Sequence, residues 1–254
     1  MIGTCALCHK NTDLQNSHLI PKWAYRRICK IDQADSKIPI HIADGNAAFS
    51  NRQTTKHLLC ADCEQRFSNS EGYLARLTAL DNGRIELFRR VMRLDTPRSV
   101  LASLHHAEDA DHLTYFAASV IWRGSVMTSG CELGPYVDKF RRYLLCETQF
   151  PREAVISVGL LEQSPNSNAD PRGWISTPAS TKAGTMWLHG FLLAGLAFRC
   201  WVGKEIPKKW HNVSLAGPNS TKYVSILKPE ECTDFLAAAE MVKMAKPRGK
   251  LAKS

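Results

Sequence analysis

The sequence lacks the segments and fingerprints that define several large classes of protein. Residues 1–5 contain neither the basic nor the apolar region of a signal peptide, so we expect a cytoplasmic protein. The longest apolar run, residues 186–202, is interrupted by His189 and Arg199 and is too short between them to cross a bilayer. There is also no P-loop, no GxSxG motif and no dinucleotide-binding fingerprint. These absences argue against secretion, membrane insertion and the commonest nucleotide-dependent and serine-hydrolase activities.

Acidic residues are outnumbered by basic ones. The chain of 254 residues has 33 Lys and Arg against 24 Asp and Glu, which gives a formal net charge of +9. This excess favours a polyanionic partner, of which nucleic acid is the commonest. A basic protein without such a partner is the alternative. With 44% apolar and 22% charged residues, the composition is that of a globular protein with room for one large domain or two smaller ones.

Cysteine is present in an odd number, nine, which indicates a reducing compartment rather than a disulfide framework. Five cysteines are scattered through apolar segments, as buried free thiols are: Cys29, Cys131, Cys146, Cys200 and Cys232. The other four form two CxxC pairs, Cys5 with Cys8 and Cys60 with Cys63. Because Zn²⁺ prefers sulfur and nitrogen ligands in tetrahedral geometry, two such pairs predict one structural zinc ion.

Periodicity predicts an α+β protein in which helices are followed by a small antiparallel sheet domain. Helices are expected after Pro21, from Cys60 to about residue 80, over residues 84–93, 107–128 and 138–146, and from residue 229 to about 245. Strands are expected over residues 154–161, 173–177 and 222–227, while residues 186–202 are expected to form a buried strand, a hairpin or a core helix. Residues 31–56 are expected to form a loop or a short hairpin, and residues 163–171 a loop.

We predict three parts along the chain: a zinc module over residues 1–80, an α+β domain over residues 81–247, and a disordered basic tail over residues 248–254. In the zinc module, the helix from Cys60 is expected to bury one stripe, formed by Cys60, Cys63, Phe67, Ser70, Leu74 and Leu77. Glu64 and Glu71 lie on a neighbouring stripe. In the second part, Trp122 and Arg123 are expected to be a core tryptophan beside a paired arginine.

The N-terminal motifs resemble those of the HNH endonucleases that carry a four-cysteine zinc. The matching residues are the first CxxC pair, the segment His18-Leu19-Ile20-Pro21, and the segment Leu59-Cys60-Ala61-Asp62-Cys63 at the start of a helix. The resemblance covers about residues 5–75 and implies a treble-clef module with structural zinc. It also implies that His18 is a general base, which deprotonates a water for attack on phosphorus beside a catalytic Mg²⁺ or Mn²⁺.

The sequence departs from the family's pattern around the catalytic metal. The Asp that usually precedes the histidine is Ser17 here, and the Asn or His that usually follows the fourth cysteine is Glu64, which can bind Mg²⁺ or Mn²⁺. Glu71 lies about 10.5 Å further along the helix, too far to bind the same ion directly, and is a candidate to orient His18 or a water. Either the metal site has been rebuilt around Glu64, with Ser17 and Glu71 in support, or catalysis has been lost.

The resemblance implies a DNA substrate. Six basic residues are candidates for contacts with phosphate: Lys22, Arg26, Arg27, Arg84, Arg89 and Arg90. The first hypothesis is thus an HNH-like nuclease, of the kind that acts as an effector in bacterial or phage conflict systems, with a protein activator or a second copy of the chain as its candidate partner. The alternative is a catalytically inactive, zinc-stabilised module that binds nucleic acid or a protein.

Overall fold

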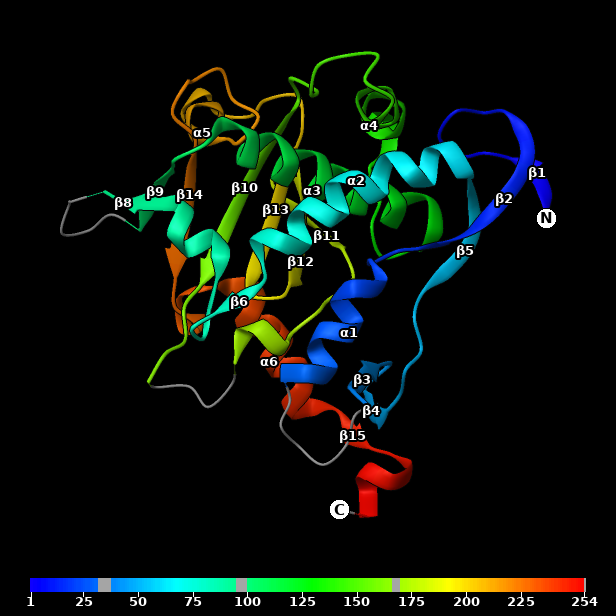
Figure 1. Cartoon of the computed structure of the whole chain (residues 1–254), viewed down its shortest axis with the longest axis vertical. Helices are drawn as coiled ribbons and strands as arrows, with labels where there is room; N and C mark the ends of the chain where they lie inside the picture. Colours follow the sequence, from blue (N-terminus) through cyan, green and yellow to red (C-terminus); the bar gives the residue numbers. More distant parts are fainter. Residues whose placement is uncertain (32–37, 95–99, 166–169, 254) are drawn as a thin grey trace.

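The computed structural model of the protein describes residues 1–31, 38–94, 100–165 and 170–253. Parts of the two predicted loops, over residues 31–56 and 163–171, lie outside the described residues. The protein combines six α-helices in the described residues with several sheets, which confirms a mixed α+β fold (Figure 1).

The first part of the chain forms a small sheet followed by a long helix. Its elements are β1 (Ile2–Thr4), β2 (Asn11–His18), α1 (Lys22–Ile31), β3 (Ile40–Ala43), β4 (Asn46–Phe49), β5 (Thr55–Cys60) and α2 (Ala61–Leu77). The small sheet has the order β1-β2-β5, and α2 follows β5 without a loop. The stripe predicted for this helix is confirmed, since Cys63, Phe67, Ser70, Leu74 and Leu77 are its buried residues.

The second part of the chain contains most of the remaining strands. Its elements are β6 (Leu80–Asp81), β7 (Arg84–Ile85), η1 (Glu86–Arg90), β8 (Val91–Arg93), β9 (Leu101–Leu104), α3 (Ala107–Met127), η2 (Gly134–Tyr136), α4 (Val137–Leu144), β10 (Ala154–Leu161), η3 (Pro171–Gly173), β11 (Ala179–Ala183), β12 (Met186–Leu193), β13 (Leu196–Val202), α5 (Lys208–Val213), β14 (Tyr223–Leu227), η4 (Pro229–Glu231), α6 (Thr233–Met244), β15 (Lys246–Pro247) and η5 (Gly249–Lys253), where η denotes a 3₁₀ helix. Three of the predicted helices correspond to α3, α4 and α6.

The largest sheet has seven strands in the order β11-β12-β13-β10-β14-β9-β8. Its neighbouring strands are antiparallel except β10 and β14, which run parallel. The sheet is therefore larger than predicted, and it is antiparallel as predicted except at the β10–β14 pair. The physical reason is that β9, which precedes α3 in the sequence, pairs with β14 more than a hundred residues later, and β8 then pairs with β9 at the edge of the sheet. The parallel pairing of β10 with β14 makes the sheet mixed.

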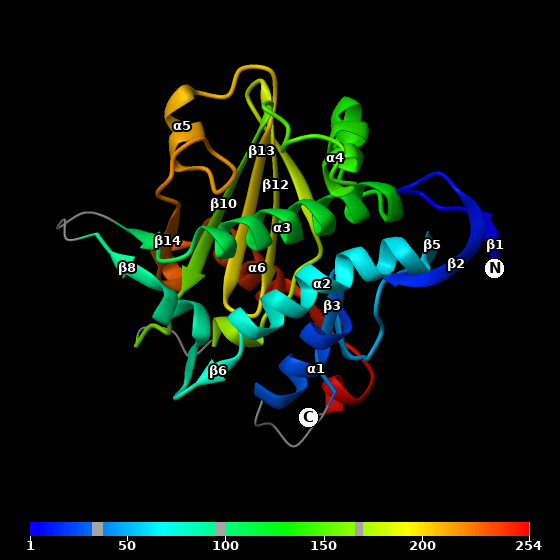
Figure 2. The same ribbon diagram turned by 45° about the horizontal axis from the view of Figure 1, so that its top comes forward.

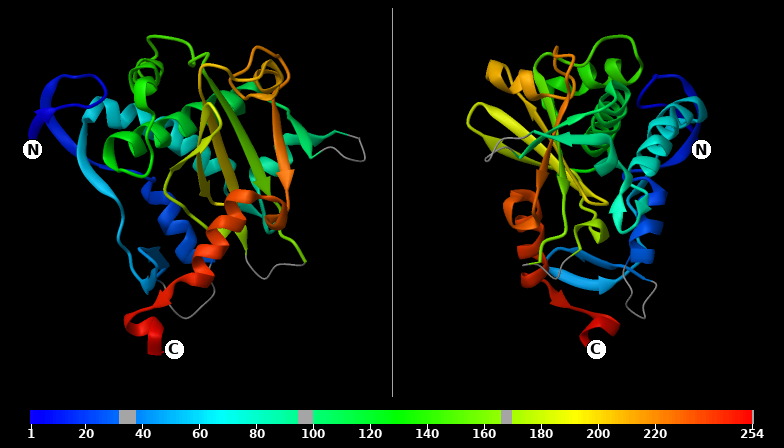
Figure 3. Two further views of the ribbon diagram at one scale, coloured as in Figure 1. Left: turned by 180° about the vertical axis from the view of Figure 1, so that it is seen from behind. Right: turned by 60° about the vertical axis from the view of Figure 1, so that its left-hand side comes forward.

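Helices cover both faces of this sheet (Figure 3). On one face, Phe116 of α3 packs against Phe198 and Phe191, with ring centroids 5.6 and 6.3 Å away. On the other face, Phe235 of α6 is buried with Leu192 of β12 and lies 4.6 Å from the ring of Trp174. Because successive residues of a strand point to opposite faces, Phe191 and Leu192 serve different helices.

Helix α3 also lies against α2, so the first part of the chain packs on the side of the large sheet that α3 covers (Figure 2). Phe67 of α2 contacts Tyr115 and Trp122 of α3 edge-on, at centroid distances of 6.1 and 6.3 Å. Most buried apolar side chains of the two parts form one continuous cluster that runs from Cys5 to Ile226, while a smaller cluster lies around Phe235 of α6.

Two further predictions of local structure are wrong. Residues 84–93 form β7, the short 3₁₀ helix η1 and β8 instead of one continuous helix, because Asn82 and Gly83, with positive φ angles of 48° and 77°, make a tight β6–β7 hairpin. The strand expected over residues 173–177 is reduced to a single bridge at Ile175, and β11 begins only at Ala179.

The apolar run of residues 186–202 forms the hairpin β12–β13, which was one of the three alternatives. Ala194 and Gly195, with φ angles of 50° and 88°, supply the two-residue turn. Within the described part of the chain, no helix has the length and apolar character needed to cross a membrane.

The end of the chain pairs with the β3–β4 hairpin instead of extending as a disordered tail. β15 runs parallel to β4, and the Lys246 amide donates to the Gly45 carbonyl oxygen at 2.9 Å. Arg248 adds a hydrogen bond from its Nε to the Asn46 side chain at 2.7 Å.

Candidate metal centre and the adjoining His18 site

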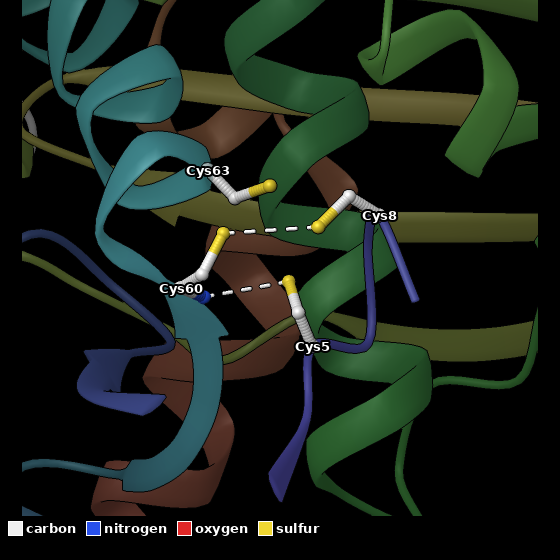
Figure 4. A group of neighbouring side chains, drawn as sticks. All are labelled: Cys5, Cys8, Cys60 and Cys63. Carbon is white, nitrogen blue, oxygen red and sulfur yellow. Dashed lines mark hydrogen bonds between the residues drawn. The ribbon is translucent and has the colours of Figure 1, made fainter. Parts of the chain in front are cut away.

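The two CxxC pairs, which are 55 residues apart in sequence, meet in space (Figure 4). Cys5 and Cys8 lie in the turn between β1 and β2, Cys60 ends β5, and Cys63 lies in the first turn of α2. Their four sulfur atoms all lie within 4.8 Å of one another. Among the described residues, no other group of three or more His, Cys, Asp or Glu side chains converges in this way.

The turn that carries the first pair is fixed by backbone hydrogen bonds. The His9 amide donates to the Cys5 carbonyl oxygen, and the Cys5 amide donates to the Lys10 carbonyl oxygen, both at 2.9 Å. His9 has a positive φ angle of 61°, which lets the chain reverse within the turn. The Ala6 amide then donates to the Leu58 carbonyl oxygen at 3.0 Å and joins the turn to β5.

The cysteine cluster fits a tetrahedral metal ion. Zn–S bonds of about 2.3 Å in a tetrahedron place neighbouring sulfur atoms about 3.8 Å apart. The Cys8 and Cys60 sulfur atoms are 3.7 Å apart, whereas a disulfide would need about 2.05 Å. All nine cysteines lie in the described part of the chain, and none forms a disulfide. Cys5, Cys8, Cys60 and Cys63 could therefore hold a metal ion such as Zn²⁺.

One thiol of the cluster is prepared for deprotonation. Burial raises the pKa of Cys5, but hydrogen bonds from the backbone of Cys8, Cys60 and Leu7 outweigh burial and lower the pKa to about 7. The Cys60 amide, for example, lies 3.4 Å from the Cys5 sulfur. A thiolate is the form that binds zinc, so this backbone arrangement favours metal binding.

His18 is the last residue of β2, where it pairs with Thr55 of β5. The side chain is half-buried. Burial lowers the pKa of His18 below its ordinary value of 6.5, and the charges of Lys22 and Arg123 lower it further, while Glu71 acts in the opposite sense. The imidazole is thus neutral at neutral pH and can accept a proton.

The four residues predicted for the catalytic site, Ser17, His18, Glu64 and Glu71, lie in one region of the protein. They form two separate sets of contacts, one between Ser17 and Glu64 and one in which Arg123 joins Glu71 to His18. Ser17, which is buried, donates a hydrogen bond to the Glu64 carboxylate. Glu71 instead accepts from Arg123 of α3, whose Nη2 lies 2.7 Å from its Oε1. The sequence interpretation of Trp122 and Arg123 as a core tryptophan and a paired arginine is confirmed, since both are buried and Arg123 pairs with Glu71.

The six basic residues predicted to contact nucleic acid divide into two groups. Lys22, Arg26 and Arg84 have exposed side chains. The others have partners within the protein, although Arg89 is exposed as well. Arg27 donates to the Ala75 carbonyl oxygen at 2.8 Å, Arg89 pairs with Asp81, and Arg90 pairs with the buried Asp109 at 3.1 Å.

Comparison with protein-family models, with curated proteins and with solved structures finds no match to this chain. The cysteine cluster and the contacts around His18 therefore provide the basis for a functional proposal.

A second histidine, His189 of β12, is fully buried in the large sheet. Its Nδ1 lies 2.7 Å from the Ser180 hydroxyl and 3.8 Å from the Cys131 sulfur, and its Nε2 has no hydrogen-bond partner among the described residues. Burial lowers the pKa of His189 from 6.5 to about 4. The folded protein therefore holds this imidazole in its neutral form.

We expect His189 to make the protein acid-sensitive. Between pH 6.5 and about 4 the unfolded chain binds a proton at this site and the folded chain does not. The contribution of neutral His189 to the free energy of unfolding is therefore fully present above pH 6.5 and is lost as the pH falls towards 4. The full loss is about 3 kcal/mol. Denaturant unfolding across this range should show a weaker pH dependence for His189→Gln than for wild type, whereas the exposed His57→Gln should match wild type. Equal slopes for His189→Gln and wild type would contradict this account.

Proposed function

We propose that the protein is an HNH-like, metal-dependent nuclease that hydrolyses phosphodiester bonds in DNA. The observation that carries the proposal is the position of His18 at the end of β2, where β2 pairs with β5 and β5 leads directly into α2. This strand-strand-helix unit brings Glu64 to Ser17 and places Glu71 within electrostatic range of His18.

A treble-clef fold for the N-terminal part belongs to the same proposal. The turn between β1 and β2 supplies one cysteine pair, and the junction of β5 and α2 supplies the other. This is the order of ligands that the resemblance implies. The chain differs by inserting α1, β3 and β4 between β2 and β5.

The proposed chemistry assigns separate roles to the two metals. Zinc on four thiolates has no open coordination position, so its role is to hold the β1–β2 turn against α2. Mg²⁺ or Mn²⁺ would be held by Glu64 with support from Ser17, and when bound would neutralise charge on the phosphate. A single carboxylate is compatible with this, because Mg²⁺ is commonly held by one or two carboxylates together with water and substrate phosphates.

His18 would accept the proton of the water that attacks phosphorus. Its lowered pKa keeps the imidazole unprotonated at neutral pH, which is the form a general base requires. The exposed Lys22, Arg26 and Arg84 would contact DNA phosphates. The proposal extends to a role as an effector in a bacterial or phage conflict system, switched on by a protein activator or by self-association.

The second candidate is a zinc-stabilised module that binds nucleic acid or a protein without cleaving it. The observation that favours it is the engagement of both carboxylates: Glu64 accepts from Ser17, and Glu71 is paired with Arg123. Neither carboxylate would then be available as an open ligand for a catalytic cation.

Cleavage assays separate the two candidates. We expect wild type to contain one zinc per chain and to nick plasmid DNA with Mg²⁺ or Mn²⁺, and His18→Ala to lower the rate at least ~100-fold, since a general base contributes about that much or more. His57→Ala is the matched control, because His57 lies on β5 of the same module and is exposed. It should cleave like wild type.

The substrate is tested with the same proteins on single-stranded DNA and on RNA. Cleavage of RNA alone would contradict the DNA assignment. Binding of DNA in a gel-shift assay, with one zinc per chain and no cleavage by wild type under either cation, would favour the binding module. Equal cleavage by His18→Ala and wild type would remove His18 from the mechanism.

A further inference from the structure

Arg123 is the most deeply buried charged side chain near His18, and its guanidinium is held on every side. Only 1% of the residue is exposed. Its Nη2 donates to Glu71 and its Nη1 to the His18 carbonyl oxygen, both at 2.7 Å, and its Nε donates to the Ser119 carbonyl oxygen at 3.4 Å. Its Cζ also lies 5.2 Å from the centre of the Phe67 ring. Its burial among the described residues therefore keeps this side chain from contacting a substrate directly.

Burying an arginine is costly unless its charge and its N–H groups are satisfied. Glu71 neutralises the charge of Arg123, which leaves the other arm of the guanidinium fork free to donate to a backbone carbonyl. The carbonyl it reaches is that of His18, 105 residues away in the sequence. The ion pair therefore connects α2, α3 and the end of β2 at one point.

The end of β2 is a position that needs such support. The strand pairing with β5 stops at His18, and the next hydrogen bond in this direction is that of the Leu19 amide to the Thr54 carbonyl oxygen, at 3.0 Å. The chain then bends towards α1. The direction of the imidazole depends on the backbone of His18, so a donor fixed to its carbonyl oxygen restricts where the ring can lie.

We propose that Arg123, held in place by Glu71, is a positioning residue for His18, so that α3 of the second part of the chain completes the active site of the first. This inference rests on the proposed nuclease function. The role of Glu71 is then to hold Arg123 in position, and Glu71 does not bind the metal ion. Through Arg123, the second part of the chain has a direct role in cleavage.

Kinetics of Arg123→Lys test the proposal. Lysine keeps the positive charge beside Glu71 but lacks the fork that reaches two acceptors. We expect kcat to fall about 10- to 100-fold, since small misplacements of a catalytic group have effects of this size. KM should stay within about 2-fold and zinc content at one per chain, because Arg123 is buried and lies outside the cysteine cluster. Arg142→Lys, which changes an exposed arginine of α4, is the control.

Hydrogen exchange of residues 17–20 provides a readout that does not depend on cleavage. In Arg123→Lys these amides should exchange about 10-fold faster or more, while the strands of the large sheet exchange as in wild type. If wild type does not cleave any substrate, the proposed function fails. The comparison of hydrogen exchange between wild type and Arg123→Lys then decides by itself whether Arg123 fixes the end of β2. Wild-type exchange at residues 17–20, or wild-type kcat, in a folded Arg123→Lys protein would overturn the inference.

A double variant covers the case in which Arg123→Lys does not fold. Arg123→Met with Glu71→Gln removes both charges, and replacing a whole buried pair is tolerated far better than breaking it. This variant should fold, retain zinc and show the same loss of kcat and of protection at residues 17–20. Retention of wild-type kcat or protection in the double variant would also overturn the proposal.

Discussion

Replacing Cys60 by Ser should release the metal ion and unfold the N-terminal part of the protein. Structural zinc contributes about 10–16 kcal/mol of binding free energy in small zinc domains at neutral pH, and this energy is coupled to folding. A serine hydroxyl is a poor ligand for Zn²⁺ compared with a thiolate. We expect zinc content to fall from one per chain to near zero and the melting temperature to fall by about 10 °C or more.

The effect should be strongest at the β1–β2 turn and the start of α2, because the cysteine cluster joins these two segments directly. The β1–β2 turn is joined to β5 by the Ala6 to Leu58 hydrogen bond and to α4 by Arg141, whose Nη1 donates to the Leu7 carbonyl oxygen at 3.0 Å. Without the metal, the β1–β2 turn and the start of α2 depend on these contacts, on the buried Leu7 and Leu59, and on the pairing of β2 with β5.

Zinc content measured by mass spectrometry, together with thermal unfolding, checks this expectation. Cys146→Ser is the matched control, since Cys146 is exposed and lies outside the cluster. Treatment of wild type with a strong chelator should reproduce the effect of Cys60→Ser, and added zinc should reverse it. Full zinc content in Cys60→Ser would show that Cys60 is not a ligand.

The cysteine cluster and α2 could be predicted from sequence because their signals are local. Each CxxC pair places two sulfur atoms close together along the chain, and the preference of Zn²⁺ for four such ligands predicts that the two pairs meet. The spacing of Cys63, Phe67 and Leu74 then matches one face of a helix, and these residues are buried.

The large sheet could not be predicted in the same way, because its strand order depends on pairings between distant segments. Residues 84–93 carry apolar side chains at helical spacing, yet β8 gains more by pairing with β9 at the edge of the sheet. The parallel contact of β10 with β14 joins Gly159 to Ser225, and no local pattern in either strand specifies that partner.

The surroundings of His18 show the same limit. Ser17, His18, Glu64 and Glu71 could be selected from motifs, but the partner of Glu71 could not. Arg123 lies 52 residues after Glu71, and only the packing of α3 against α2 brings the two together. A buried arginine on an apolar helix was the available signal, and it predicted a paired residue without indicating which one.

The continuous apolar cluster leads to a last expectation, that the two parts of the chain unfold together. Phe67 of α2 and Phe198 of β13 are both fully buried and belong to the same cluster, linked through α3. Truncating a buried phenylalanine to alanine removes its burial and leaves a cavity, which costs about 3–5 kcal/mol. If the zinc-loaded protein is one cooperative unit, Phe67→Ala and Phe198→Ala should each lower the midpoint of a single transition.

Denaturant unfolding of zinc-loaded protein, followed by circular dichroism and by hydrogen exchange in both parts of the chain, distinguishes one unit from two. Leu236→Ala is the control, because Leu236 is 48% exposed on α6 and its truncation should change stability by no more than about 0.5 kcal/mol. Two transitions, with Phe67→Ala moving one and Phe198→Ala the other, would instead support a boundary near residue 80. A single transition moved by both variants would mean that α3 joins the cysteine module to the large sheet energetically, the condition under which Arg123 can hold His18 in place.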